Sequence, residues 1–385
     1  MRRLVASLLA SLVVLTLAPA PGSAEGQNVT LVASATQVEH GHPVALSGRI
    51  SPAAAGQRIE LRDPLGGVLA AASTDAAGVF SVDATPAATT TYRAFWGAAS
   101  SEPVTVQVRA VVSARMPAAR LFDTLTVRGS VHPARPGEPV EIALLREGRV
   151  VGSRLVHQDA DGGFTASFRV MEPGRYRARA AVSAADLLRD SAASDPSTTP
   201  LPRLREGSTG TFVRLLEERL VELRYRLAGR RDGRYDRRTA DAVVAFHKVQ
   251  RMDRTFVVDA ATWRALADPV VPRPRVEGQA FRFEVDQTRQ VLYTIERGEI
   301  TNILHVSTGA GGATRDGSYR VFRKLAGYSP NRLWYPSYFD GLRALHGWTE
   351  VPTYAASHGC VRIPYWNAKW VYRLASYGTR IVIYH

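Results

Sequence analysis

A set of short landmarks occurs twice in the first half of the 385-residue chain, and no other feature of the sequence constrains the fold as strongly. Gly48-Arg-Ile-Ser-Pro52 returns 81 residues later as Gly129-Ser-Val-His-Pro133. Asp75-Ala-Ala-Gly-Val-Phe80 returns 84 residues later as Asp159-Ala-Asp-Gly-Gly-Phe164. Within each copy, alternating apolar and polar residues form short segments that Gly and Pro turns separate. Two copies of such a unit predict two antiparallel β-sandwiches.

The two repeats, residues 25–110 and 111–198, resemble the immunoglobulin-like spacer modules of bacterial proteins. No cluster of titratable side chains occurs in both copies. We therefore expect a stalk, with carbohydrate or protein binding as the alternative. Residues 185–204, which include Ser194-Asp-Pro-Ser-Thr-Thr-Pro-Leu-Pro202, have the composition of a linker.

The N-terminus has the parts of an export signal. Met1-Arg2-Arg3 is basic, residues 4–18 are apolar, and small residues lead to Ala24. This order predicts a secretory signal peptide at residues 1–24. The alternative is an uncleaved anchor helix, but the run is shorter than the roughly 20 apolar residues that a bilayer crossing needs. We expect a secreted protein of the cell wall or envelope, outside the cytoplasmic membrane and not inserted in it.

The charge balance is strongly positive, with a formal net charge of +14. Only three of the 49 basic residues are lysine, a bias typical of a GC-rich genome. The positive charge is therefore a weak indication of a nucleic-acid partner, and we expect none. A basic exported protein is instead attracted to an anionic cell envelope.

A helical segment is predicted from Leu204 onward. Apolar residues recur at the helical spacing of three and four: Val213, Leu216, Leu220, Leu223 and Leu227. Thr239 is expected to cap a second helix, and Asp259 to open a short third one.

Residues 203–268 resemble the peptidoglycan-binding type 1 domain. The landmarks are Asp232-Gly-Arg-Tyr-Asp236, Ala242-Val-Val-Ala-Phe246 and Val258-Asp-Ala-Ala-Thr-Trp263. The resemblance implies a three-helix domain that binds wall glycan. The sequence departs from the family at Arg224 and at Thr255-Phe256, where glycine is usual, and at His247, where glutamine is usual. A spacer that has lost glycan binding is the alternative.

A mainly β domain with one helix is predicted at residues 275–385, after a Pro-rich extended linker at residues 268–276. Strands are predicted within 281–285, 291–307 and 380–384. The helix is expected from the spacing of Ala368, Val371, Leu374 and Ala375. The fold class is thus multidomain, with two all-β sandwiches, a three-helix domain and this C-terminal domain.

The only cysteine, Cys360, follows Ser357-His358-Gly359 and lies 14 residues after His346. Thiol catalysis needs a nucleophile, a base and donors for an oxyanion, and histidine suits the base because its pKa lies near neutrality. Arg362 is expected to lower the pKa of the thiol. A buried inert cysteine is one alternative. A zinc site of His346, His358 and Cys360 is another, although no nearby carboxylate completes its shell.

These residues resemble the catalytic domain of the L,D-transpeptidases, the YkuD family. The resemblance rests on Ala344-Leu-His346-Gly347, on Ser357-His-Gly-Cys-Val-Arg-Ile-Pro364 and on Val306-Ser-Thr-Gly309. It departs at Thr314-Arg-Asp-Gly317, where proline commonly follows the threonine.

The resemblance also implies a role for each site residue. Cys360 is the nucleophile, His346 its general acid/base, and His358 and Ser357 lie in the same pocket as support. Arg362 orients the substrate or polarises the thiolate, and the amides of Gly359 and Cys360 form an oxyanion site. Because Gly347 stands where some members have serine, we expect a backbone carbonyl to orient His346.

The implied reaction is acyl transfer between peptidoglycan stem peptides, giving 3→3 cross-links through a thioester on Cys360. It needs no metal and no cofactor, and the partners are the stem peptides and the glycan, bound by a monomer. One alternative is an L,D-carboxypeptidase that uses the same cysteine with water as acceptor. The other is a non-catalytic cell-wall-binding scaffold.

Overall fold

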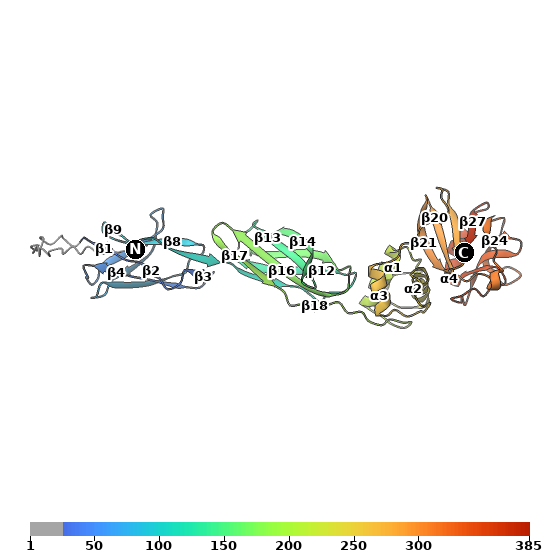
Figure 1. Ribbon diagram of the computed structural model, residues 1–385, viewed down its shortest axis with the longest axis horizontal. Helices are drawn as coiled ribbons and strands as arrows, with labels where there is room; N and C mark the ends of the chain where they lie inside the picture. Colours follow the sequence, from blue (N-terminus) through green and yellow to red (C-terminus); the bar gives the residue numbers. More distant parts are fainter. Residues whose placement is uncertain (1–25) are drawn as a thin grey trace, which may run out of the picture.

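The computed structural model describes residues 26–385, so the expected signal peptide at residues 1–24 lies outside the described residues. Two β-rich modules, a helical module and a β-rich C-terminal domain follow one another along an elongated molecule (Figure 1). The multidomain fold class predicted from the sequence is confirmed. Within residues 26–385, the helices are all too short or too polar to cross a bilayer.

The first β module packs two sheets around one apolar core. One sheet contains β1 (Asn28–Val29), β4 (Val44–Ser51), β2 (Val32–Ala33) and β7 (Val79–Ala84). The other contains β6 (Val68–Ser73), β5 (Arg58–Arg62), β8 (Thr90–Trp96) and β10 (Val104–Arg109), joined by β3 (Gln37–Glu39) and β9 (Ala99–Ser100).

The second β module repeats this arrangement. One sheet contains β11 (Val111–Arg115), β12 (Thr124–His132) and β15 (Gly163–Arg169). The other contains β14 (Arg149–His157), β13 (Pro139–Arg146), β16 (Arg175–Ala184), β17 (Leu187–Ala193) and β18 (Ser197–Thr198). Both modules agree with the expected immunoglobulin-like sandwiches.

The linker expected at residues 185–204 is partly wrong. β17 occupies its first half, because the chain turns at Ala185-Asp186 and pairs back onto β16. β17 also pairs with β10 of the first module through Arg109 and Leu188. The same junction has a backbone hydrogen bond from the Thr89 N–H of the first module to Asp186 O of the second at 2.8 Å. The two sandwiches are therefore joined by direct contacts.

The repeated glycine has a packing role in both modules. A Cβ on Gly48 would lie 1.9 Å from Thr30 O and 2.5 Å from the Phe80 ring. A Cβ on Gly129 would lie 2.0 Å from the Ser113 carbonyl oxygen and meet the equivalent phenylalanine ring. Glycine in a strand interior often marks such a close approach. The sequence repeat therefore reflects one packing motif used twice.

The helical module consists of α1 (Thr211–Glu222), α2 (Arg237–Val249) and α3 (Ala260–Ala267). Asp236, not Thr239, caps α2: its carboxylate accepts hydrogen bonds from the N–H groups of Arg238 and Thr239. Thr239 lies in the first helical turn, where its hydroxyl turns inward and donates to the buried carboxylate of Glu217 at 3.0 Å. α3 begins at the expected Asp259, which forms a capping box with Thr262.

The C-terminal domain has two sheets and one α-helix. The first sheet has the order β21 (Glu299–His305), β20 (Val291–Glu296), β19 (Arg282–Asp286), β27 (Arg380–Tyr384) and β22 (Gly317–Arg320). The second contains β23 (Arg323–Lys324), β24 (Trp334–Asp340), β25 (Arg343–Trp348) and β26 (Val361–Pro364). A single turn of 3₁₀-helix spans Ala310–Gly312, and α4 (Tyr365–Leu374) packs on β24 and β25.

The helical module is docked on this domain and shares a core with it. The segment after α1 pairs with β21: the Arg226 N–H donates to Ile303 O at 2.9 Å, and the Ile303 N–H donates to Arg224 O at 2.8 Å. Since β21 is an edge strand, this pairing covers backbone groups that would otherwise be open to another chain. The linker also binds both parts: the side chain of Gln250 pairs with the backbone of Val270, and the buried Glu284 accepts two backbone N–H groups farther along it.

Candidate active site

Cys360 lies immediately before β26, which runs parallel to β25 with His346 opposite Arg362. Residues two apart on a strand face the same side. Leu345 and Val361 face the core, so His346, Cys360 and Arg362 lie on the other face together. The pairing of these two strands thus brings a thiol, an imidazole and a guanidinium to one side of the sheet.

His346 is held in one orientation and is almost fully buried, with 2% of its surface exposed. Its Nδ1 lies 2.9 Å from Gly347 O. Nδ1 must therefore carry the proton and donate it to this carbonyl, which leaves Nε2 unprotonated and able to accept one. Burial lowers the pKa of His346 to about 4, and the positive charge of Arg362 acts in the same direction. The imidazole is consequently neutral at physiological pH.

Cys360 is half-buried, and its thiol donates to Leu342 O at 3.8 Å. Burial raises the pKa of the Cys360 thiol, although the Ala344 backbone, Arg362 and Arg343 all act to lower it. Arg362 therefore acts in the expected direction, but the loss of hydration outweighs the nearby cations and the net shift of the thiol pKa is upward. Both the thiol and the imidazole are therefore neutral at rest.

Ser357 organises the turn that carries the cysteine. Its hydroxyl donates to Cys360 O at 2.6 Å and accepts from the Gly359 N–H at 3.1 Å. The Gly359 amide, expected to help bind an oxyanion, thus already has an acceptor. The N–H of Cys360 makes no hydrogen bond within residues 26–385, so it is available to a substrate oxygen.

Gly359 is required by the geometry of this turn. Its φ is +124°, and a Cβ there would lie 2.6 Å from Arg343 Nε and 2.9 Å from Ala313 O. The Thr314 hydroxyl donates to Gly359 O at 2.9 Å, and Arg343 Nε donates to Ala313 O at 3.0 Å. Sequence reasoning assigned no role to Thr314 or Arg343. In the sequence, Thr314 stood out only as part of Thr314-Arg-Asp-Gly317, which departs from the family pattern, and Arg343 only as an arginine three residues before His346.

His358 is not brought into this cluster. Its side chain is exposed and makes no hydrogen bond to the described part of the chain. The support expected from His358 in the pocket is therefore absent from this arrangement. Across residues 26–385, no three His, Cys, Asp or Glu side chains are grouped closely enough to hold a metal ion.

A second line of hydrogen bonds supports the turn from the helical module. Lys248 on α2 donates from Nζ to the carbonyl oxygens of Gln290 and Val306, both at 2.9 Å, and to His305 Nδ1 at 2.6 Å. The Gln290 side chain binds Thr308, whose carbonyl accepts the Ser357 N–H at 3.0 Å. These hydrogen bonds connect the helical module to the turn of residues 357–360, which we call the catalytic turn.

Comparison with known proteins identifies two domains of the chain. The model of the L,D-transpeptidase catalytic domain, YkuD, matches residues 280–383, and the model of a peptidoglycan binding domain matches residues 209–266. An L,D-transpeptidase from Xylanimonas cellulosilytica DSM 15894 is 33% identical; the alignment covers 48% of this chain and 99% of that chain, with a TM-score of 0.45. An L,D-transpeptidase from Stackebrandtia nassauensis is 24% identical, over 49% of this chain and 98% of that chain, with a TM-score of 0.32. Among proteins of curated function, none matches.

The C-terminal domain is thus an L,D-transpeptidase catalytic domain, preceded by a peptidoglycan binding domain. The chain belongs to the L,D-transpeptidase family. These two domains associate the protein with peptidoglycan and the cell wall.

Proposed function

We propose that this chain is a secreted L,D-transpeptidase that forms 3→3 cross-links between peptidoglycan stem peptides through a thioester on Cys360. The observation that carries the proposal is the pairing of β25 and β26, which places the Cys360 thiol on the same face as the buried, neutral His346. A neutral imidazole with a free Nε2 is the form that can take a proton from a thiol.

Acylation begins when His346 Nε2 accepts the proton of the Cys360 thiol as the sulfur attacks the carbonyl carbon of the third stem residue. The tetrahedral oxyanion is stabilised by the free N–H of Cys360. When this intermediate collapses, the carbon–nitrogen bond to the terminal D-alanine breaks and His346 returns the proton to the departing amine. The products are a thioester on Cys360 and free D-alanine.

Transfer reverses the roles of the same groups. The side-chain amine of a diamino acid in a second stem attacks the thioester carbonyl, and His346 removes a proton from the nitrogen. The carbon–sulfur bond then breaks, the cysteine is reprotonated, and a new amide joins the two stems. The energy of the original peptide bond is conserved in the thioester, so the reaction consumes no ATP.

The proposal is tested with purified protein and soluble disaccharide-tetrapeptides. Mass spectrometry should detect a dimer that lacks one D-alanine, and fragmentation should place the new bond between two third-position residues. Cys360→Ala should form none. If wild-type protein gives only tripeptide monomers, water is the acceptor and the protein is an L,D-carboxypeptidase. If it gives no product, the protein is a non-catalytic wall-binding scaffold.

A further inference from the structure

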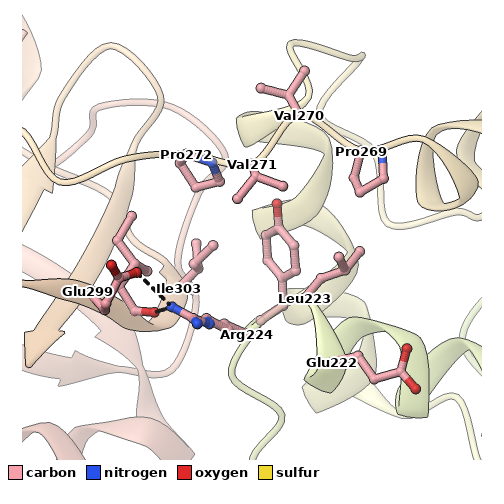
Figure 2. A pocket seen from close by; sticks show the side chains of 11 residues that line it. Glu222, Leu223, Arg224, Pro269, Val270, Val271, Pro272, Glu299 and Ile303 are labelled. Atoms are coloured by element: carbon pink, nitrogen blue, oxygen red, sulfur yellow. Dashed lines mark hydrogen bonds and ion pairs between the residues drawn. The ribbon is translucent and has the colours of Figure 1, made fainter.

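A cleft with an apolar end and a basic end lies where the helical module meets the catalytic domain. The apolar end is a cavity of about 230 Å³. Figure 2 shows Val271 and Pro272 of the linker on one side of this cavity, with Leu223 and Ile303 on the other. Three separate parts of the chain therefore build it: the end of α1, the linker and β21.

The basic end is a larger cavity of about 620 Å³ that shares Arg224 with the apolar end. Four arginines line it: Arg224, Arg226, Arg230 and Arg231. Two carboxylates line the cleft, both at its apolar end: the exposed Glu299 lies 3.6 Å from Arg224 Nη1, and Glu222 pairs with Arg169 and Arg219. Within residues 26–385, the guanidinium groups of Arg226, Arg230 and Arg231 form no ion pair. The cleft thus holds an excess of positive charge.

Arg226 is the member of this group that most needs a partner. Its guanidinium lies 4.2 Å from the centre of the Trp370 ring, and its Nε is buried without a hydrogen bond. Burial lowers the pKa of Arg226, and no acidic group opposes this shift. An anion in the cleft would offset the unpaired positive charge of Arg226.

Arg224 has an unfavourable backbone conformation for its residue type. Its φ of +69° lies in the left-handed region that favours glycine. Its guanidinium nevertheless donates to Ile300 O at the wall of the cleft and lines both cavities. An arginine at this position places one more cation in the cleft at the expense of backbone strain.

The cleft is separate from the catalytic turn. Asn302 lines the basic end, while Ser307, farther along the same segment, pairs with Arg362 beside Cys360. These five residues of extended chain span roughly 17 Å, at about 3.3 Å per residue. A fully extended tetrapeptide is roughly 14 Å long. A stem whose third residue is attached to Cys360 is therefore too short to fill the cleft as well.

We propose that this cleft binds a second, non-reacting peptide stem of the wall, with the free carboxylates of the stem on the arginines and its small apolar side chains in the apolar end. The inference rests on the proposed function for the identity of the substrate. An anionic wall polymer joined by phosphodiesters would satisfy the arginines but leave the apolar end unfilled, so the composition of the cleft favours a peptide. Binding there would hold the enzyme on uncross-linked wall while Cys360 reacts with another stem.

The experiment uses the mature chain with Cys360→Ala, so that no chemistry occurs, and a synthetic stem tetrapeptide that carries a photoreactive diazirine. After irradiation and digestion, mass spectrometry locates the labelled peptides. The proposal predicts label in residues 221–231 or 268–272, in addition to the catalytic turn. Arg230→Gln combined with Arg231→Gln should weaken this cleft labelling by about tenfold, the loss expected for one or two charged contacts.

The matched control is Arg234→Gln combined with Arg264→Gln, which removes two exposed arginines of the same module outside the cleft. The control should label like the parent protein. Label confined to the catalytic turn, no label at all, or equal losses in both double variants would overturn the proposal. Displacement by a glycerol phosphate oligomer at a lower concentration than by unlabelled tetrapeptide would assign the cleft to an anionic polymer instead. Cross-link formation by wild-type protein, measured in parallel, tests the proposed function independently.

Discussion

Cys360 and His346 lie in surroundings that keep both groups uncharged near neutral pH. This differs from a preformed thiolate–imidazolium pair, in which the cysteine is already ionised before substrate binds. In the proposed mechanism, the proton instead moves to His346 as the sulfur attacks. The rate of acylation should therefore depend on His346 being unprotonated.

The pH dependence follows from the depressed pKa of His346. Because burial lowers this pKa to about 4, lowering the pH should remove the base only as the pH falls through about 4. The protonation of His346 should therefore change the second-order rate constant for acylation by a carbapenem little between pH 8 and pH 5. A histidine with the ordinary pKa of about 6.5 would instead become protonated within this range. Stopped-flow or intact-mass kinetics would measure it, and an acid limb centred near pH 6.5 would refute the assignment.

The two histidines should contribute unequally. His346→Ala removes a positioned acid/base and should lower turnover by about 10²–10⁴-fold. His358→Ala removes an exposed side chain with no hydrogen bond to the described chain, and should retain much more activity. Steady-state assays of both variants, with circular dichroism to confirm folding, would measure the difference. A larger loss in His358→Ala would show that His358, and not His346, is the base.

At the scale of elements, the catalytic turn depends on contacts from a distant segment. The hydroxyl of Thr314 is buried, donates to Gly359 O at 2.9 Å and accepts the Gly309 N–H at 2.7 Å. This residue touches no reacting atom, so its effect would be one of positioning.

Thr314→Val keeps the shape of the side chain and removes both hydrogen bonds. We expect it to lower the free energy of unfolding by about 1–3 kcal/mol, since two buried backbone groups lose a partner. The acylation rate should fall while the pH dependence set by His346 stays unchanged. Thr314→Ser keeps the hydroxyl and should recover most of the rate. Equal rates for Val and Ser variants would show that the hydrogen bonds do not position the turn.

The sequence predicted elements well where the pattern was local. The spacing around Val213 and Leu216 predicted α1, and Asp259 correctly marked the start of α3. Thr239 was the wrong cap because Asp236, three residues earlier, also fits the pattern of a polar cap, and the Thr239 hydroxyl instead donates to the buried Glu217. The sequence could not predict the net direction of the Cys360 pKa shift, because this shift depends on how deeply the folded chain buries the thiol.

At the scale of the whole molecule, the helical module and the catalytic domain do not act as two independent parts joined by a free linker. Nothing in the sequence indicated that Lys248 would reach into the neighbouring domain, because two of its three partners are backbone carbonyls, which any sequence supplies, and the third, His305, is 57 residues away in the sequence. The Pro-rich composition indicated a linker, and residues 268–276 form neither helix nor strand. It carried no information on Glu284, whose carboxylate binds that segment.

Lys248→Met tests the importance of this docking. The substitution removes the Lys248 hydrogen bonds to Val306 O and to Gln290 O, which keeps only the Val306 N–H at 3.2 Å, and we expect the free energy of unfolding to fall by about 1–3 kcal/mol. Lys369→Met, at an exposed position on α4, is the control and should change it by less than about 0.5 kcal/mol. Denaturant unfolding of the mature chain measures both. Equal stability of the two variants would show that the docked arrangement does not depend on Lys248.

The central claim is that Cys360 carries the acyl group during the reaction, and intact-mass spectrometry of the protein tests it most directly. The mature chain is mixed with a disaccharide-tetrapeptide donor, quenched in acid within the first turnover and weighed. If Cys360 is the nucleophile, the spectrum should contain one adduct equal to the donor minus D-alanine. The adduct should map to the peptide that contains Cys360 and be missing in Cys360→Ala. An adduct of the same mass on the Cys360→Ala protein, or cross-linked product formed by that variant at the wild-type rate, would contradict it.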